Sequence, residues 1–152
     1  MQPFPHHYRA TVTAGPKGQV EITSPGLKPL TSEPPREFDG PGTLWSPETL
    51  LVAAVADCLA LTFRAIAGIN RFSWTSLTCT ATGTLNHSDE GARFTALKLY
   101  ARLSLPAGAD PTQARKILEK AEKACLIGNS LKCVPVLEVQ LTFDAKTVPI
   151  SA

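Results

Sequence analysis

The sequence predicts an α+β fold in which antiparallel strands surround one long apolar helix. Three observations lead to this prediction. Segments of alternating apolar and polar residues occur near both ends and in the middle of the chain, and two segments with helix start signals separate them. The resulting order of strands, helix, hairpin, helix and strand is typical of α+β proteins. The 152 residues suit one domain over residues 1–152, although two small lobes folded together would also fit.

The N-terminal part is predicted to form short strands joined by turns. Residues 8–14, YRATVTA, alternate in polarity as a strand does. The GPKG sequence at 15–18 indicates a turn into a second strand at 19–24, which makes a hairpin. Residues 27–42 are interrupted by prolines and predict a short edge strand followed by a loop.

The stretch WSPETLLVAAVADCLALTFRAIAG, from Trp45 to Gly68, predicts a central helix. Ser46 is a suitable N-cap, Pro47 suits the first helical position, and Glu48 suits the positive end of the helix dipole. The polar residues after it are only Thr49, Asp57, Thr62 and Arg64. Because so few side chains prefer water, we expect this helix to have almost no solvated face and to run through the middle of the molecule.

The second half of the chain predicts a hairpin, a helix and a last strand. Residues 76–85 and 94–105 alternate in polarity, and the polar segment 86–93 between them favours an antiparallel connection. Asp110 as N-cap and Pro111 start an amphipathic helix that carries Cys125 in its last turn, before a stop signal at Gly128 and Asn129. Residues 136–146 alternate again and predict the final strand.

Composition excludes several classes of function. The net charge is +2, with acids and bases interspersed, so neither a nucleic acid nor another polyanion is an expected partner. The N-terminus lacks the pattern of a signal peptide, which favours the cytoplasm, where thiols stay reduced. The apolar run from Leu50 to Ile66 is too short for a membrane span and contains two charged residues. The three histidines lack the spacing of a zinc site.

In a reducing compartment, four cysteines are interpreted as buried thiols, redox thiols or metal ligands rather than as a structural disulfide framework: Cys58, Cys79, Cys125 and Cys133. Cys58 and Cys125 both lie on apolar helix faces, so their thiols could meet if the two helices pack together. Spacing by itself nevertheless favours two inert core thiols over a redox pair, because a free cysteine is often just a small hydrophobic residue. Cys79 alternates with threonines on the inward face of a strand and is predicted to be a packed core thiol.

Two motifs resemble the OsmC-like superfamily, which includes the organic hydroperoxide resistance proteins. They are SPETLLVAAVADC, where the cysteine follows a Pro-Glu pair by ten residues, and ACLIGNSLK around the second helical cysteine. The resemblance implies an intertwined homodimer that reduces organic hydroperoxides through two cysteines, without metal, flavin or haem. It also suggests a dithiol reductant of the lipoyl type. It implies that Cys58 is the peroxidatic cysteine and Cys125 the resolving one.

The resemblance also implies that Glu48 holds an arginine that stabilises the thiolate. Arg36 fits this role best, with Arg9 and Arg64 as rivals. Glu48 precedes Cys58 by ten residues, which is about 15 Å along a helix, so we expect Glu48 of one subunit to serve Cys58 of the other. A role for Glu48 as a simple helix-dipole partner remains the alternative.

Three features depart from the family pattern. Asp57 directly precedes Cys58 and would disfavour a thiolate unless it faces away, Leu126 replaces a common proline, and Cys133 is a possible competing resolver. Two other functions therefore stay open: a non-enzymatic, stress-associated dimer that binds a small apolar ligand, and a thiol-based redox sensor.

Overall fold

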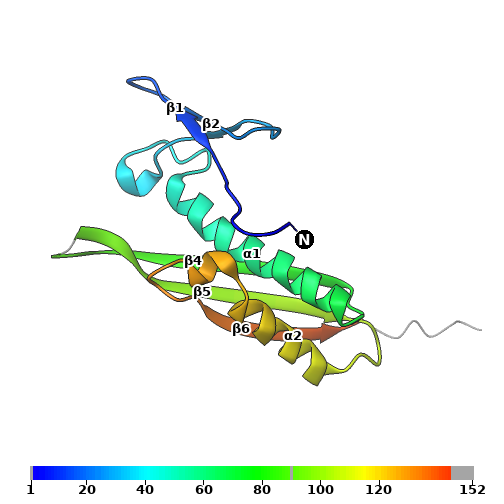
Figure 1. Ribbon diagram of the computed structural model, residues 1–152. Coiled ribbons are helices and arrows are strands. Elements are labelled where there is room, and N and C mark those ends of the chain that lie inside the picture. Colours follow the sequence, from blue (N-terminus) through cyan, green and yellow to red (C-terminus); the bar gives the residue numbers. More distant parts are fainter. Residues whose placement is uncertain (1, 90, 145–152) are drawn as a thin grey trace, which may run out of the picture. The chain divides into compact units, whose positions relative to one another are not determined.

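The computed structural model describes residues 2–89 and 91–144, which divide between two compact units, Met1–Leu51 and Val52–Ala152. The predicted α+β architecture is confirmed: two three-stranded sheets accompany one long helix (Figure 1). The first unit contains β1 (Thr11–Thr13), β2 (Val20–Thr23), β3 (Leu30–Ser32), the 3₁₀ turn η1 (Arg36–Phe38) and the start of α1 (Pro47–Ile69). The second contains the rest of α1, β4 (Ser76–Ser88), β5 (Gly91–Leu105), α2 (Pro111–Lys123), α3 (Leu126–Asn129) and β6 (Val136–Phe143).

The sheet of the first unit has the order β1-β2-β3, and both of its strand pairs are antiparallel. The predicted hairpin and edge strand are therefore confirmed. The first strand is shorter than predicted, because only Thr11–Thr13 pair with β2, and all three of these residues are exposed. The alternating polarity of residues 8–14 therefore predicted a strand correctly, although neither face of that strand is buried.

The start of α1 is the one predicted. The Ser46 hydroxyl accepts the backbone N–H of Thr49 at 3.2 Å, and the Thr49 hydroxyl accepts the N–H of Ser46 at 2.8 Å. Pro47 is the first helical residue. These reciprocal bonds satisfy backbone donors that a helix N-terminus otherwise leaves unpaired, so they determine where α1 begins.

The sheet of the second unit has the order β4-β5-β6. The predicted antiparallel hairpin of β4 and β5 is confirmed, and β6 pairs with β5 in parallel. The connection is tighter than predicted, because pairing continues until Ser88 faces Gly91, whose φ of +99° suits glycine. The last predicted residues of the final strand, 145 and 146, lie outside the described residues.

The core of the second unit lies between its sheet and the helices α1 and α2. The inward side chains of β5 are buried, as predicted, and the outward side chains Lys98 and Arg102 are exposed. Both helices contribute to the same cluster of buried residues. The α1 members, spaced by four, are Val55, Leu59, Phe63 and Ala67.

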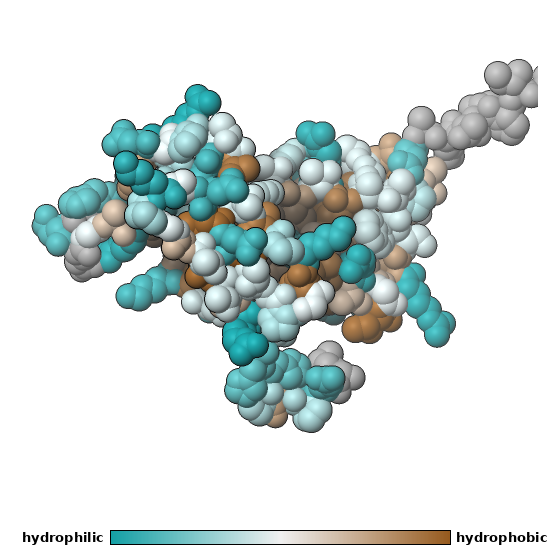
Figure 2. All heavy atoms as spheres, turned by 90° about the horizontal axis from the view of Figure 1, so that it is seen from above, coloured by the Kyte–Doolittle hydropathy of each residue, from teal (hydrophilic) through white to brown (hydrophobic). Residues whose placement is uncertain are grey.

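Within this chain α1 is buried along one stripe only. Its other faces are apolar yet partly open to solvent, with Leu61 45% and Ile69 82% exposed, and Figure 2 shows apolar side chains reaching the surface among polar ones. The prediction of a helix with almost no solvated face is thus wrong for the single chain. Composition shows that the helix is hydrophobic, but it does not show which parts of the protein cover the helix.

The length and composition of α1 contradict one argument against a membrane span. The helix has 23 residues and contains an 18-residue window with a mean hydropathy of 2.0, so it is long and apolar enough to cross a membrane by length and composition. The sequence argument that the apolar run from Leu50 to Ile66 is too short for a membrane span is therefore wrong for the helix in the structure. Core helices of soluble proteins satisfy the same criterion, and the buried stripe gives α1 such a role in the second unit.

Candidate active site

Cys58 lies in α1, directly before the buried Leu59, and is itself half-buried. Its neighbour Asp57 is exposed. Successive helical residues point about 100° apart, so the carboxylate reaches solvent while the thiol stays at the edge of the core. The repulsion expected from Asp57 is weakened accordingly, since water screens an exposed charge.

The sequence predicted that Cys125 lies in the last turn of α2, and this prediction is wrong. α2 ends at Lys123, and Cys125 is the N-cap of the four-residue helix α3. The Asn129 side chain donates to the Lys123 carbonyl at 2.8 Å, so it caps the end of α2 and lets the chain turn early. The inward position of Cys125 is nevertheless confirmed, since the residue is only 3% exposed.

The structure brings these two thiols together. Both are free, and the pKa of the Cys125 thiol is raised, first by burial and further by an electrostatic interaction with Cys58. The backbone N–H of Gly128 donates to the Cys125 sulfur at 3.4 Å and opposes this rise in pKa. This interaction places the Cys58 and Cys125 thiols near each other, which is the first condition for a disulfide between them.

The other two cysteines are placed differently. Cys79 packs against the core of the second unit, as predicted, and burial raises the pKa of its thiol to about 11. It therefore stays protonated near neutral pH, where a thiol is a poor nucleophile. Cys133 is half-buried in the segment between α3 and β6.

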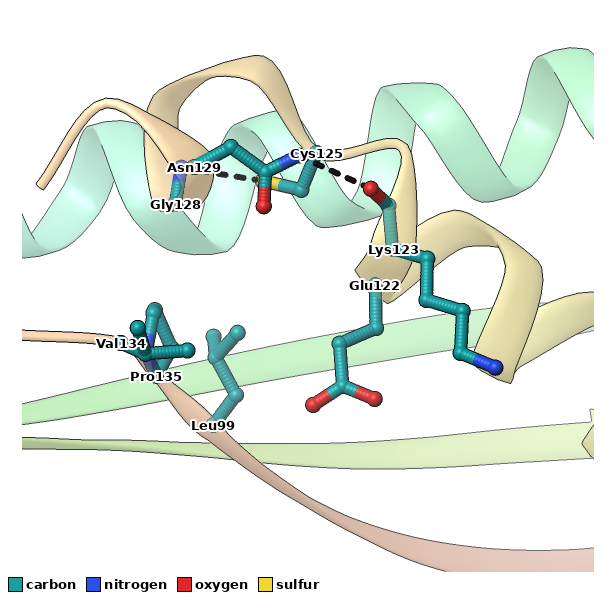
Figure 3. A pocket seen from close by; sticks show the side chains of 8 residues that line it. All are labelled: Leu99, Glu122, Lys123, Cys125, Gly128, Asn129, Val134 and Pro135. Carbon is teal, nitrogen blue, oxygen red and sulfur yellow. Dashed lines mark hydrogen bonds between the residues drawn. The ribbon is translucent and has the colours of Figure 1, made fainter.

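A cavity of about 180 Å³ opens beside Cys125 in the second unit (Figure 3). Apolar side chains from β5 and the segment before β6 form part of its wall, and polar residues of α2 and α3 form the rest. The lining residues are Leu99, Glu122, Lys123, Cys125, Gly128, Asn129, Val134 and Pro135.

Glu48 faces a second cavity, of about 290 Å³, that lies within the first unit. Oε2 of its carboxylate is buried and has no hydrogen-bond partner among the described residues. Burying a carboxylate oxygen without a partner is unfavourable, so this arrangement is suited to receive a cation or hydrogen-bond donor. The lining residues are Val20, Ser32, Glu33, Pro34, Pro35, Phe38, Pro47 and Glu48.

Arg36, the predicted source of that cation, is exposed at the start of η1. Its side chain crosses over Gly42, where an added Cβ would lie 2.5 Å from the Arg36 Cγ. Gly42 also has a φ of +65°, so both its conformation and its lack of a side chain suit this crossing. Since Glu48 Oε2 is unpaired, Arg36 of the same chain does not bond that oxygen.

Glu33 organises the turn that leads into α1, and the sequence analysis missed it. Its Oε1 accepts the backbone N–H of Thr43 at 2.5 Å, the Thr43 hydroxyl at 2.9 Å and the N–H of Leu44 at 2.9 Å. These bonds, that from the Thr43 N–H foremost, lower the pKa of Glu33. A single acid in a proline-rich loop carries no periodic signal, so no sequence pattern identifies it.

The fold and this site define an α+β protein with two adjacent free thiols, one on a long apolar helix and one beside a small cavity. The model of the family of OsmC-like proteins matches residues 40–140. The chain belongs to this family, and the resemblance found in the two cysteine motifs is thereby confirmed.

Individual relatives agree with this membership. The chain is 30% identical over 136 residues to the peroxiredoxin OsmC of Escherichia coli (strain K12), covering 89% of this chain and 92% of that protein. An OsmC-like protein of unknown function from Vibrio cholerae superimposes with a TM-score of 0.82 at 22% identity, covering 90% of this chain and 100% of that one. An organic hydroperoxide resistance protein OsmC from Legionella pneumophila gives 0.72 at 24% identity, covering 92% and 99%.

Proposed function

We propose that this protein is a thiol peroxidase that reduces organic hydroperoxides, with Cys58 as the peroxidatic and Cys125 as the resolving cysteine. The observation that carries the proposal is the interaction between these two free thiols. Family membership and the E. coli relative described as a peroxiredoxin support it. The name of the Legionella neighbour favours organic hydroperoxides as the substrate class.

The reaction needs only two thiols and an external reductant. The Cys58 thiolate attacks the distal oxygen of ROOH, the O–O bond breaks, and Cys58 becomes a sulfenic acid. The departing alkoxide takes up a proton, equivalent to the one that the thiol lost on ionisation, and becomes ROH. The Cys125 thiol then attacks that sulfur and displaces water, which leaves a Cys58–Cys125 disulfide. A dithiol returns both cysteines to thiols and is itself oxidised to a disulfide.

A partner subunit completes this site in our proposal. Apolar surroundings disfavour a thiolate, so a cation is needed near Cys58. We assign this role to Arg36, held by Glu48 of the subunit that does not contribute Cys58. The unpaired buried Oε2 of Glu48 supports a missing cationic partner. Solvent-exposed Leu61 and Ile69 of α1 support burial of this helix against a second copy of the chain.

Oxidation by a single equivalent of cumene hydroperoxide should convert Cys58 and Cys125 into an intrachain disulfide. Mass spectrometry and a thiol count should show the loss of two thiols per chain, and peptide mapping should find those two cysteines joined. Cys79 and Cys133 should remain free. Mapping that joins Cys58 to Cys79 or Cys133, or that finds no disulfide, would contradict the assigned pair.

Mixing inactive Glu48→Ala subunits with inactive Cys58→Ser subunits should restore activity if the site is shared. A mixed dimer rebuilds one intact combination of Glu48 and Cys58, so we expect about half the activity of a wild-type dimer. The measurement is peroxide consumption after verified subunit exchange. Exchange without recovery, or a monomer in sedimentation, would leave Glu48 as a helix-dipole partner.

Arg36→Ala subunits serve as a further arm of that experiment. They should be inactive alone, as Glu48→Ala subunits are. A fully active Arg36→Ala dimer would instead assign the cation to Arg9, Arg64 or another residue.

A further inference from the structure

The cavity in the second unit meets the thiol pair from one side only. Cys125 is among its lining residues, and Cys58 is not. The cavity therefore gives access to one sulfur of the pair. Figure 3 shows Cys125 among the side chains that line the cavity. In the oxidised protein, a molecule in this cavity would therefore meet the Cys58–Cys125 bond at its Cys125 end.

We propose that this cavity admits the thiol end of the dithiol reductant, which attacks the disulfide at Cys125. The proposal rests on the peroxidase function above and specifies where the reductant enters. Hydroperoxide and reductant then use different sides of the thiol pair, because the hydroperoxide must reach Cys58.

The lining suits a short aliphatic thiol. Leu99, Val134 and Pro135 provide apolar contacts for methylene groups, and Pro135 is itself buried. The polar lining residues Glu122, Lys123 and Asn129 are partly or fully exposed. The volume of about 180 Å³ is several times the roughly 30 Å³ that one water molecule occupies in the liquid, so several atoms of a thiol-bearing chain fit.

The dithiol reduces the Cys58–Cys125 disulfide in two thiol–disulfide exchange steps. The reductant thiolate forms a bond to the Cys125 sulfur, the bond between the cysteines breaks, and Cys58 leaves as a thiolate. The second thiol of the reductant, as a thiolate, attacks the reductant sulfur bound to Cys125 and releases the Cys125 thiolate. The dithiol has then become a cyclic disulfide, and the two protons it gave up are available to the two released cysteines.

Leaving-group chemistry also favours attack of the reductant on Cys125. A thiol leaves more slowly the higher its pKa, and burial raises the pKa of Cys125. Attack on Cys58 would have to expel Cys125, whereas attack on Cys125 releases Cys58. Access and leaving-group chemistry thus agree on Cys125 as the sulfur attacked.

Trapping the first step tests this assignment directly. The oxidised protein is mixed briefly with 2-mercaptoethanol and quenched with excess N-ethylmaleimide, which alkylates whichever cysteine has been released. Peptide mapping should find the mercaptoethanol on Cys125 and the maleimide on Cys58. The reverse pattern would overturn the proposed entry while leaving the two-cysteine peroxidase intact. Failure to form the Cys58–Cys125 disulfide at all would instead contradict the proposed function.

Gly128→Ala narrows the cavity at the sulfur. A Cβ at this position would lie 3.4 Å from the Cys125 sulfur and 3.5 Å from the Pro135 Cγ, both within ordinary van der Waals contact. The backbone N–H that bonds Cys125 is retained. We expect reduction of the preformed disulfide by dithiothreitol to slow on the order of tenfold, and oxidation of Cys58 by cumene hydroperoxide to slow far less.

Gly15→Ala is the control variant, since Gly15 lies in the turn between β1 and β2, where an added Cβ would contact only the Lys17 carbonyl oxygen, at an ordinary 3.6 Å. It should leave both half-reactions at the wild-type rate. If the disulfide of Gly128→Ala is reduced as fast as that of Gly15→Ala, or if oxidation and reduction slow equally, the cavity is not the entry of the reductant.

Discussion

Replacing Cys58 with serine should abolish hydroperoxide reduction, lowering the rate by about three orders of magnitude or more, as expected when a covalent nucleophile is removed. A serine hydroxyl is not ionised near neutral pH, and it cannot form the disulfide that carries the electrons. Consumption of cumene or tert-butyl hydroperoxide in the presence of dithiothreitol measures the effect.

Cys79→Ser is the matched control for this experiment. Cys79 is also a partly buried thiol of the second unit, but its pKa of about 11 keeps it protonated under the assay conditions. Its replacement should leave turnover close to wild type. Equal turnover of wild type and Cys58→Ser would reject the peroxidase and favour a non-enzymatic dimer that binds a small apolar ligand. Rapid oxidation of wild-type Cys58 with only slow turnover would instead indicate a thiol sensor.

Replacing Cys125 with serine should separate the first oxidation from turnover. Cys58 should still accept one oxidising equivalent and form a sulfenic acid, but no disulfide can follow. Under excess peroxide this sulfenic acid should oxidise further to a sulfinic acid. Steady-state turnover with dithiothreitol should fall strongly, and intact-mass spectrometry should show first one and then two added oxygen atoms.

Cys133→Ser tests the competing resolver. Since Cys125 is the thiol that interacts with Cys58, this variant should form the disulfide and turn over as wild type does. If Cys133→Ser accumulates the sulfinic acid while Cys125→Ser does not, the resolving role belongs to Cys133.

Local signals in the sequence were sufficient for the positions of most elements. Ser46 and Asp110 accept backbone N–H groups at the two predicted helix starts, because capping depends on residues only two or three positions apart. The long hairpin was also predictable, since alternation extends through β4 and β5. The end of α2 was not predicted: the Asn129 side chain bonds the Lys123 carbonyl six residues back, where α2 ends, and Cys125 lies in a separate turn.

By itself, the sequence determined the α+β class, the apolar character of α1 and the two cysteine motifs that indicate the family. Only the tertiary structure decided that Cys58 and Cys125 interact, that Cys125 borders a cavity, and that Glu33 holds the turn before α1. Periodicity reports the face on which a side chain lies, because it follows from the geometry of one element. Which partners meet on that face depends on packing between elements distant in the chain, and no local pattern encodes it.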